Sequence, residues 1–165
     1  MSVRRSSYVS GHKPKFLVIV DDTPECDRAI YFGARRAVRT GAVLALLCVA
    51  DPGSSQDWLG VGDLIAKHAE DAGWALVQRA AERACVVSGI NPETAVRRGS
   101  RTEQILQAID DDSDISFLVL AASSSAEGPG PLILNLVAKS SGSFPIPVVI
   151  VPETMGDDEI DPSAG

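Results

Sequence analysis

The chain contains few of the residues from which catalytic and metal centres are commonly built. It has two histidines, His12 and His68, and three widely spaced cysteines, with no CxxC pair and no cluster of cysteine with histidine. We therefore expect neither a zinc site nor a disulfide framework. The motifs GxSxG, GxxxxGK-S/T and HExxH are also absent. The sequence thus gives little support for an enzyme, and at most for slow hydrolysis through bound water and metal.

Long apolar runs and an excess of basic residues are missing as well. No apolar run approaches the roughly 20 residues that span a bilayer, and the N-terminal segment lacks the apolar core of a secretory signal. The net charge is −7 and the sequence pI is about 4.7. Nucleic acids and anionic membranes both bind basic surfaces, so we expect neither as a partner. A cytoplasmic location is the default expectation.

Charge is distributed unevenly between the two ends of the chain. The first fifteen residues contain two arginines and two lysines but no acid, whereas residues 156–165 contain four acids but no base. Such segments are typical of solvated, flexible ends. We predict a flexible extension over residues 1–14, one domain over 15–152 and a flexible acidic tail over 153–165. The total of 165 residues suits a single domain with a sizeable core.

Short apolar runs alternate with segments of helical periodicity along most of the chain. Continuous apolar runs rich in β-branched residues indicate strands that are buried on both faces, as in a parallel sheet. This order predicts an α/β fold, a doubly wound five-stranded parallel sheet with helices on both faces and right-handed crossovers. The predicted strands lie at 16–20, 42–50, 93–98, 115–122 and 145–152, and the predicted helices at 24–40, 61–88, from 100 onward and at 131–139.

Local signals predict how several of these helices begin and which faces they bury. Thr23 is a candidate N-cap with Pro24 at the first helical position, and Ser100 with Glu103 matches a capping box. In the long helix over 61–88, one stripe contains Val61, Ile65, His68, Ala72, Ala75, Arg79 and Val86, and we expect this stripe to face the sheet. The three cysteines, Cys26, Cys48 and Cys85, lie among apolar neighbours and are expected to be buried.

The predicted fold locates a ligand site before any residue is considered. In such sheets ligands bind beyond the carboxyl ends of the strands, where the strand order reverses. With the first strand central, the loops DDTPE and ASSSAEGPGPL would flank that crevice. Asp21 and Asp22 could bond to a ligand or hold a divalent cation beside phosphates, and Asp22 could equally serve only to cap the following helix. For Asp21 we favour a functional role, because placing a charged group at the end of a buried strand costs free energy.

The loop after the fourth strand has features that favour and features that oppose phosphate binding. The three serines at 123–125 supply hydroxyls, and Gly128 and Gly130 permit close backbone approach. Pro129 and Pro131 have no N–H to donate, and Glu127 adds a negative charge. A phosphate cradle and an ordinary turn that starts a helix at Pro131 both remain possible.

Two further segments, the aspartate run before the fourth strand and the fifth strand itself, lead to predictions about solvent exposure and partners. The run Asp110–Asp114 contains four aspartates before the fourth strand and is expected to be a solvated connection. The fifth predicted strand, PVVIV, is entirely apolar and comes last in the topology. An exposed apolar edge invites pairing with another chain, so we predict a homodimer across this strand. The alternative is that the C-terminal tail covers it.

These segments, taken in order, resemble the universal stress protein family. The resemblance covers about residues 15–152 and rests on the stretches LVIVDDTPECDRAIYFGARRA, AVLALLCVADP, RRGSRTEQILQAI, SFLVLAASSS and PIPVVIVP. It implies the strand order 3-2-1-4-5 and a dimer. Family members that bind ATP resemble one another in a motif G-x2-G-x9-G-S/T after the fourth strand. The resemblance also implies adenosine contacts from the Asp ending the first strand and from the backbone of the Val ending the second, here Asp21 and Val49.

The glycine motif itself diverges in this chain. Counted from the fourth strand, its first two glycines fall on Ala121 and Ser124, and counted back from Pro147 its Gly-Ser pair falls on Leu134 and Asn135. The resemblance therefore implies either a stress-response or signalling protein that binds ATP, AMP or another adenine nucleotide with a divalent cation, or a member that binds none and acts through dimerisation and protein contacts. The candidate nucleotide-binding residues are Asp21, Asp22, Val49, Ala121, Ser123, Ser124, Gly128, Gly130 and Asn135.

Overall fold

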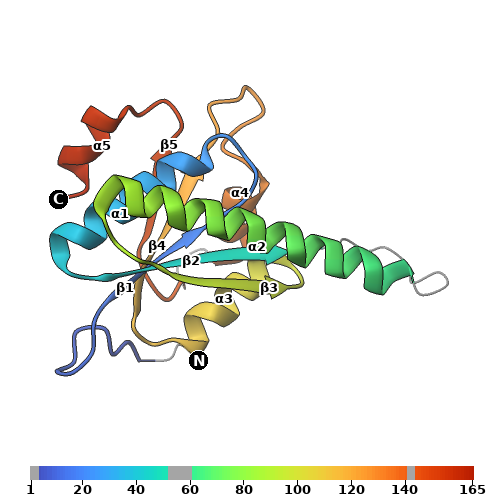
Figure 1. The fold of residues 1–165 in the computed structure, drawn as a ribbon, viewed down its shortest axis with the longest axis horizontal. Helices are drawn as coiled ribbons and strands as arrows, with labels where there is room; N and C mark the ends of the chain where they lie inside the picture. Colours follow the sequence, from blue (N-terminus) through green and yellow to red (C-terminus); the bar gives the residue numbers. More distant parts are fainter. Residues whose placement is uncertain (1–3, 52–60, 141–143) are drawn as a thin grey trace.

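The computed structural model describes residues 4–51, 61–140 and 144–165, which form one parallel sheet flanked by helices (Figure 1). The five strands are hydrogen-bonded in the order β3-β2-β1-β4-β5, and each neighbouring pair is parallel, so the predicted fold class is confirmed. The elements in chain order are β1 (Lys15–Ile19), α1 (Cys26–Thr40), β2 (Val43–Ala50), α2 (Val61–Ser88), β3 (Glu93–Arg98), α3 (Arg101–Asp111), β4 (Ile115–Ala122), α4 (Pro131–Ser140), β5 (Val148–Pro152) and α5 (Asp157–Ser163).

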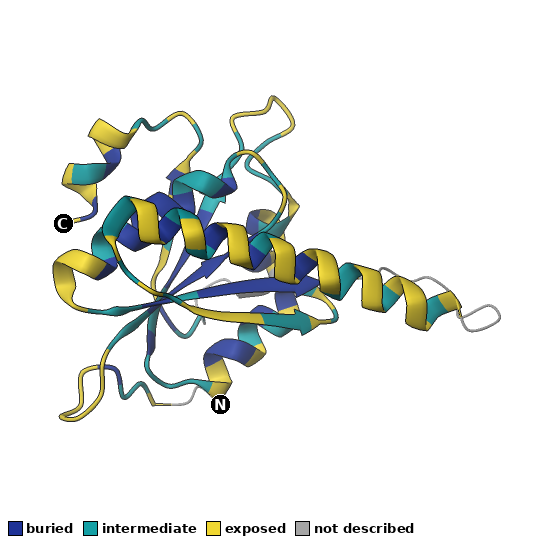
Figure 2. Ribbon diagram, in the orientation of Figure 1, coloured by how far each residue is buried: buried dark blue, intermediate teal, exposed yellow. Residues whose placement is uncertain are grey.

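The central strand β1 is buried on both faces, which explains its unbroken apolar sequence. Phe16 and Val18 pack with α1 and α2 on one face, whereas Leu17 and Ile19 pack with α3 and α4 on the other. These four side chains are at most 5% exposed. Figure 2 shows the buried residues concentrated in the strands and on the helix faces that cover them. Burying each such side chain stabilises the fold by about 1.5–3 kcal/mol.

Helix α2 has the predicted length but buries a different face. Gly73, Val77, Ala80 and Ala84 are its buried residues, whereas Val86, expected to face the sheet, is 81% exposed. A small residue is required at the closest approach, since a Cβ on Gly73 would lie 3.2 Å from Val96 Cγ1. The start of α2 extends past the end of the sheet (Figure 1), and its apolar side chains Val61 and Leu64 are 48% and 60% exposed there. The hydrophobic pattern of α2 alone therefore predicted the wrong stripe.

Two predicted helix caps are not formed. Helix α1 begins at Cys26 rather than at Pro24, and the Thr23 hydroxyl donates to Asp21 instead of capping the helix. Ser100 does occupy the N-cap position of α3 with an extended backbone, but its side chain makes no capping hydrogen bond. The start of α3 was thus predicted at the right place for a reason that the structure does not support.

The acidic tail is not a flexible segment, as had been predicted, but a helix docked on α1. Ile160 of α5 is fully buried in the same core layer as α1 and α2. Asp157 pairs with Arg28 at 2.8 Å, and Asp161 Oδ1 accepts hydrogen bonds from Tyr31 at 2.9 Å and from Arg35 Nε at 3.0 Å. Burial of one apolar side chain and complementary charge therefore order this segment.

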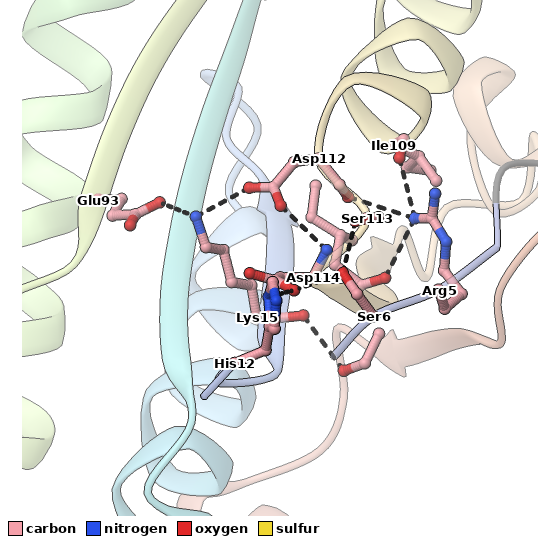
Figure 3. Close-up of polar contacts among 11 residues, drawn as sticks. Arg5, Ser6, His12, Lys15, Glu93, Ile109, Asp112, Ser113 and Asp114 are labelled. Atoms are coloured by element: carbon pink, nitrogen blue, oxygen red, sulfur yellow. Dashed lines mark hydrogen bonds and ion pairs between the residues drawn. The ribbon is translucent and has the colours of Figure 1, made fainter. Parts of the chain in front are cut away.

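The basic N-terminal segment also makes specific contacts, contrary to the predicted flexible extension over 1–14. From residue 4 it runs along the amino ends of the strands, where it meets the acidic run before β4 (Figure 3). Ser6 Oγ donates to Asp114 at 2.8 Å, and His12 Nδ1 lies 2.8 Å from the same carboxylate oxygen. Arg5 donates to the carbonyl of Ile109 at 2.9 Å. The aspartate run, expected to be a solvated connection, is instead the docking site of this segment.

Lys15, at the start of β1, links three parts of the structure at the same end of the sheet (Figure 3). Its Nζ lies 2.8 Å from Asp112 Oδ2 and 3.0 Å from Glu93 Oε2 at the start of β3. Partial burial opposes the charged form, but the hydrogen bonds that Lys15 donates to Asp112 and Glu93 outweigh it and raise the pKa of Lys15. Lys15 therefore stays charged and closes this end of the sheet.

We predict that Ile160→Ala lowers the free energy of unfolding by about 2–4 kcal/mol, because it leaves a cavity under α5. Urea denaturation followed by circular dichroism measures this change. The control Val86→Ala truncates a side chain that is 81% exposed and should shift the value by less than about 0.5 kcal/mol. Equal effects of the two substitutions would show that α5 is not packed on the core.

Candidate functional site

The carboxyl ends of β1 and β4 border a narrow crevice of about 110 Å³. Ile19 and Leu120 form its apolar base, and the turn before α1 contributes Asp21 and Thr23. The opposite wall consists of the start of α4, from Gly130 to Ile133. The crevice lies where the strand order reverses at β1 and β4, as the predicted fold required.

Asp21 is held in this crevice by the turn that follows β1. Its Oδ1 accepts hydrogen bonds from the Thr23 hydroxyl and from the Thr23 N–H, the latter at 3.0 Å. Its Oδ2 lies 3.9 Å from Arg101 Nη1, and the side chain is 20% exposed. One carboxylate oxygen is thus fixed by the turn, while the other lies beside Arg101 with capacity to accept further hydrogen bonds.

Arg101 is a site residue that the sequence interpretation missed. It is the first residue of α3 and lines the crevice, and its Nη1 lies 3.9 Å from Asp21 Oδ2. A usable signal was present, since the carboxyl ends of all strands in a parallel sheet meet at one edge, and the loop after β3 therefore ends beside the loops after β1 and β4. Arg101 brings a permanent positive charge to the crevice.

The loop after β4 uses most of its own hydrogen-bond donors. Ser124 donates both its N–H and its hydroxyl to Glu153 Oε2, each at 2.8 Å. Four other amides donate within the loop: Ser123 N to Pro129 O at 3.2 Å, and Ser125 N to Ser123 Oγ, Glu127 N to Ser125 Oγ and Gly128 N to Ser125 O, each at 3.1 Å. With prolines at 129 and 131, the loop is an internally bonded turn that leads into α4.

The structure brings together some of the predicted site residues and separates others. Asp21, Ala121 and Gly130 line the crevice, and Ser123, Gly128 and Gly130 line an adjoining depression of about 340 Å³. Asp22 is exposed beside a different groove, between α1 and α2. Val49 is buried against α3, and Asn135 is exposed on α4; neither is among the residues that line the crevice.

The groove beside Asp22 contains an ion-pair cluster. Asp27 accepts a hydrogen bond from Arg83 Nε at 2.8 Å and is also paired with Arg28. Partial burial opposes ionisation of Asp27, but the hydrogen bonds from these two arginines prevail and lower its pKa. The guanidinium groups of Arg28 and Arg83 also lie over the Tyr31 ring. This cluster joins α1 to α2.

Over residues 4–51, 61–140 and 144–165, no group of three or more His, Cys, Asp or Glu side chains is arranged to hold a metal ion. Within the same ranges no helix has the length and apolar character to cross a membrane.

The architecture and the crevice together define the class of protein. A five-stranded parallel sheet in the order 3-2-1-4-5, with a crevice at the β1 and β4 ends, is a doubly wound α/β fold with a crevice at the topological switch point. The profile of the universal stress protein family matches residues 14–152. The chain therefore belongs to the universal stress protein family. Helix α5 lies outside the matched region.

Solved structures agree with this assignment at the level of the fold. The universal stress protein UspA from Lactobacillus plantarum has a TM-score of 0.67 at 20% identity, covering 84% of this chain and 97% of its own. A family protein from Arabidopsis thaliana with AMP bound has a TM-score of 0.53 at 18% identity, covering 84% and 91%. The Archaeoglobus fulgidus protein in complex with dAMP has a TM-score of 0.56 at 15% identity, covering 92% and 99%. No curated protein sequence matches the chain significantly.

The three cysteines differ in environment, and the prediction that Cys85 is buried is wrong. Cys26 and Cys48 are buried, whereas Cys85 is exposed because it follows the buried Ala84 on α2 and points away from the sheet. Burial raises the pKa of the Cys26 thiol to about 12 and raises that of Cys48 as well. A thiol with a raised pKa contains little of the reactive thiolate at neutral pH.

We predict that one thiol per chain reacts rapidly with Ellman's reagent at pH 8 under native conditions, and that the other two react only in denaturant. The control is Cys85→Ser, which should abolish the rapid phase and leave the two slow thiols. Rapid reaction of two or three thiols in the native protein would contradict the buried positions of Cys26 and Cys48.

Proposed function

We propose that this protein is a stress-response or signalling protein that binds an adenine nucleotide in the crevice between β1 and β4. The observation that carries the proposal is the carboxylate of Asp21, which is oriented by Thr23 and faces the crevice with Arg101 at 3.9 Å. Family membership supports it, and structural neighbours from Arabidopsis thaliana and Archaeoglobus fulgidus hold AMP and dAMP. Asp21 would accept hydrogen bonds from ligand hydroxyl or amino groups.

The crevice is too small to hold a whole nucleotide, so the ligand would have to extend beyond it. Ligand pockets commonly measure about 300–1,000 Å³, so a volume of about 110 Å³ does not accommodate a nucleotide by itself. The adjoining depression of about 340 Å³ shares Glu25, Gly130 and Pro131 with the crevice. A nucleotide would therefore extend from Asp21 across the start of α4 into this depression. Arg101 would supply positive charge beside Asp21.

We predict that Asp21→Ala weakens adenine-nucleotide binding about ten-fold, because a hydrogen bond to a charged group is lost. Isothermal titration calorimetry with ATP, ADP and AMP measures the change. The matched control Asp110→Ala removes an exposed aspartate at the end of α3 and should leave the affinity unchanged. Unchanged affinity of the Asp21 variant would remove this residue from the site, and no heat with any nucleotide would refute the proposed function.

The alternative function is that of a family member that binds no nucleotide and acts through protein contacts. The observation that favours it is the internally bonded loop after β4, whose amides are largely used within the protein. Whether or not the protein binds a nucleotide, the exposed edge of β5 is a candidate surface for protein contacts. β5 is the last strand of the sheet, and its side chains Val148 and Ile150 are 38% and 43% exposed. The C-terminal tail leaves them uncovered, since α5 packs on α1.

We propose a homodimer through the β5 edge and predict that Ile150→Lys converts it to a monomer, because a charged edge strand disfavours pairing. Size-exclusion chromatography with light scattering at tens of micromolar measures the mass. Val86→Lys, which places the same charge on exposed α2, is the control and should leave the mass of a dimer. A wild-type protein that is already a monomer at this concentration would refute the dimer.

A further inference from the structure

Glu153 occupies the hydrogen-bond donors that would otherwise be offered to a ligand by the loop after β4. It follows β5 directly, and its N–H donates to the carbonyl of Ala122 at 2.9 Å, so its backbone continues the pairing of β4 with β5. From this position its carboxylate accepts both the N–H and the hydroxyl of Ser124 at 2.8 Å. A carboxylate bound in this manner is an internal substitute for an anion.

The charge of Glu153 persists at neutral pH. Hydrogen bonds from the Ser124 N–H and hydroxyl stabilise the ionised form and lower the pKa of Glu153. A phosphate that approached Ser124 would therefore meet a negative charge as well as occupied donors. Displacement of Glu153 would leave its carboxylate near the incoming phosphate.

Neighbouring charges act in the same direction. Glu25 and Glu127 line the depression that adjoins the crevice, together with Gly128 and Gly130. Of the residues that line the crevice and this depression, Arg101 alone is basic. A chain of several phosphates along the loop would thus approach two or three carboxylates and be repelled by them. A single phosphate carries fewer negative charges, so its repulsion by these carboxylates is weaker.

We propose that Glu153 determines the specificity of the crevice by excluding polyphosphate chains, so that the ligand is an adenine nucleotide with one phosphate rather than a triphosphate. This inference rests on the proposed nucleotide-binding function and specifies the class of nucleotide. Asp21 and Arg101 line the crevice, and neither Ser124 nor Glu153 is among its lining residues, so Asp21 and Arg101 can contact the same ligand without displacing Glu153.

The test is calorimetric titration of the wild-type chain and of Glu153→Gln with AMP and ATP, at low and at moderate ionic strength. The glutamine removes one charge and keeps an oxygen that can accept from Ser124. We expect the wild type to bind AMP about ten-fold or more tightly than ATP at low salt, with a smaller ratio as salt screens the carboxylates. Glu153→Gln should improve ATP binding about five-fold and leave AMP binding unchanged.

Controls separate this inference from the function on which it rests. Glu82→Gln neutralises an exposed glutamate on α2 and should change neither affinity. Circular dichroism of Glu153→Gln establishes that the fold is retained. If wild type and variant bind ATP as tightly as AMP, the specificity role of Glu153 is refuted while nucleotide binding stands. If neither protein binds either nucleotide, the proposed function and the inference both fall.

Discussion

Burial of the central strand β1 on both faces is the constraint on which the rest of the structure depends. Phe16 and Val18 face one helical layer, and Leu17 and Ile19 face the other. A strand covered on both sides cannot end in water without a polar turn, and here the turn begins with Asp21. Because neighbouring strands are parallel, the carboxyl ends of β1 and β4 meet at one edge, and the starts of α3 and α4 are brought to the same place. The crevice is thus a consequence of how β1 is buried.

Electrostatics distinguishes the two ends of the sheet. At the amino ends, Lys15 pairs with Asp112, and the N-terminal segment donates hydrogen bonds to Asp114 and to the carbonyl of Ile109, so this end is closed by contacts within the chain. On α1, the acidic helix α5 neutralises Arg28 and Arg35. Each charged end of the chain therefore docks on a surface of opposite sign. The carboxyl ends of the strands remain as the edge where Asp21 and Arg101 face a crevice.

The local sequence of the loop after β4 leaves its role open, and a contact with a distant residue decides it. Its serines and glycines are compatible with a phosphate cradle, and its two prolines with a turn. The outcome depends on Glu153, which is 29 residues further along the chain and reaches Ser124 only because β5 pairs with β4. No local pattern could reveal that partner. The same holds for Arg101, whose relation to Asp21 arises from the meeting of two separate loops.

The sequence by itself determined the strands and the positions of most helices, because apolar runs and helical periodicity report directly on burial. The strand order followed from the resemblance to the universal stress protein family. It also placed Asp21 at the edge where a ligand would bind. Tertiary structure decided which stripe of α2 faces the sheet, since Gly73 must admit Val96 closely. It decided that both charged ends dock, since Ile160 and the opposing ion pairs act only once α1 is folded. These features depend on contacts between segments that are far apart in the chain, and the pattern of residues along the sequence does not reveal such contacts.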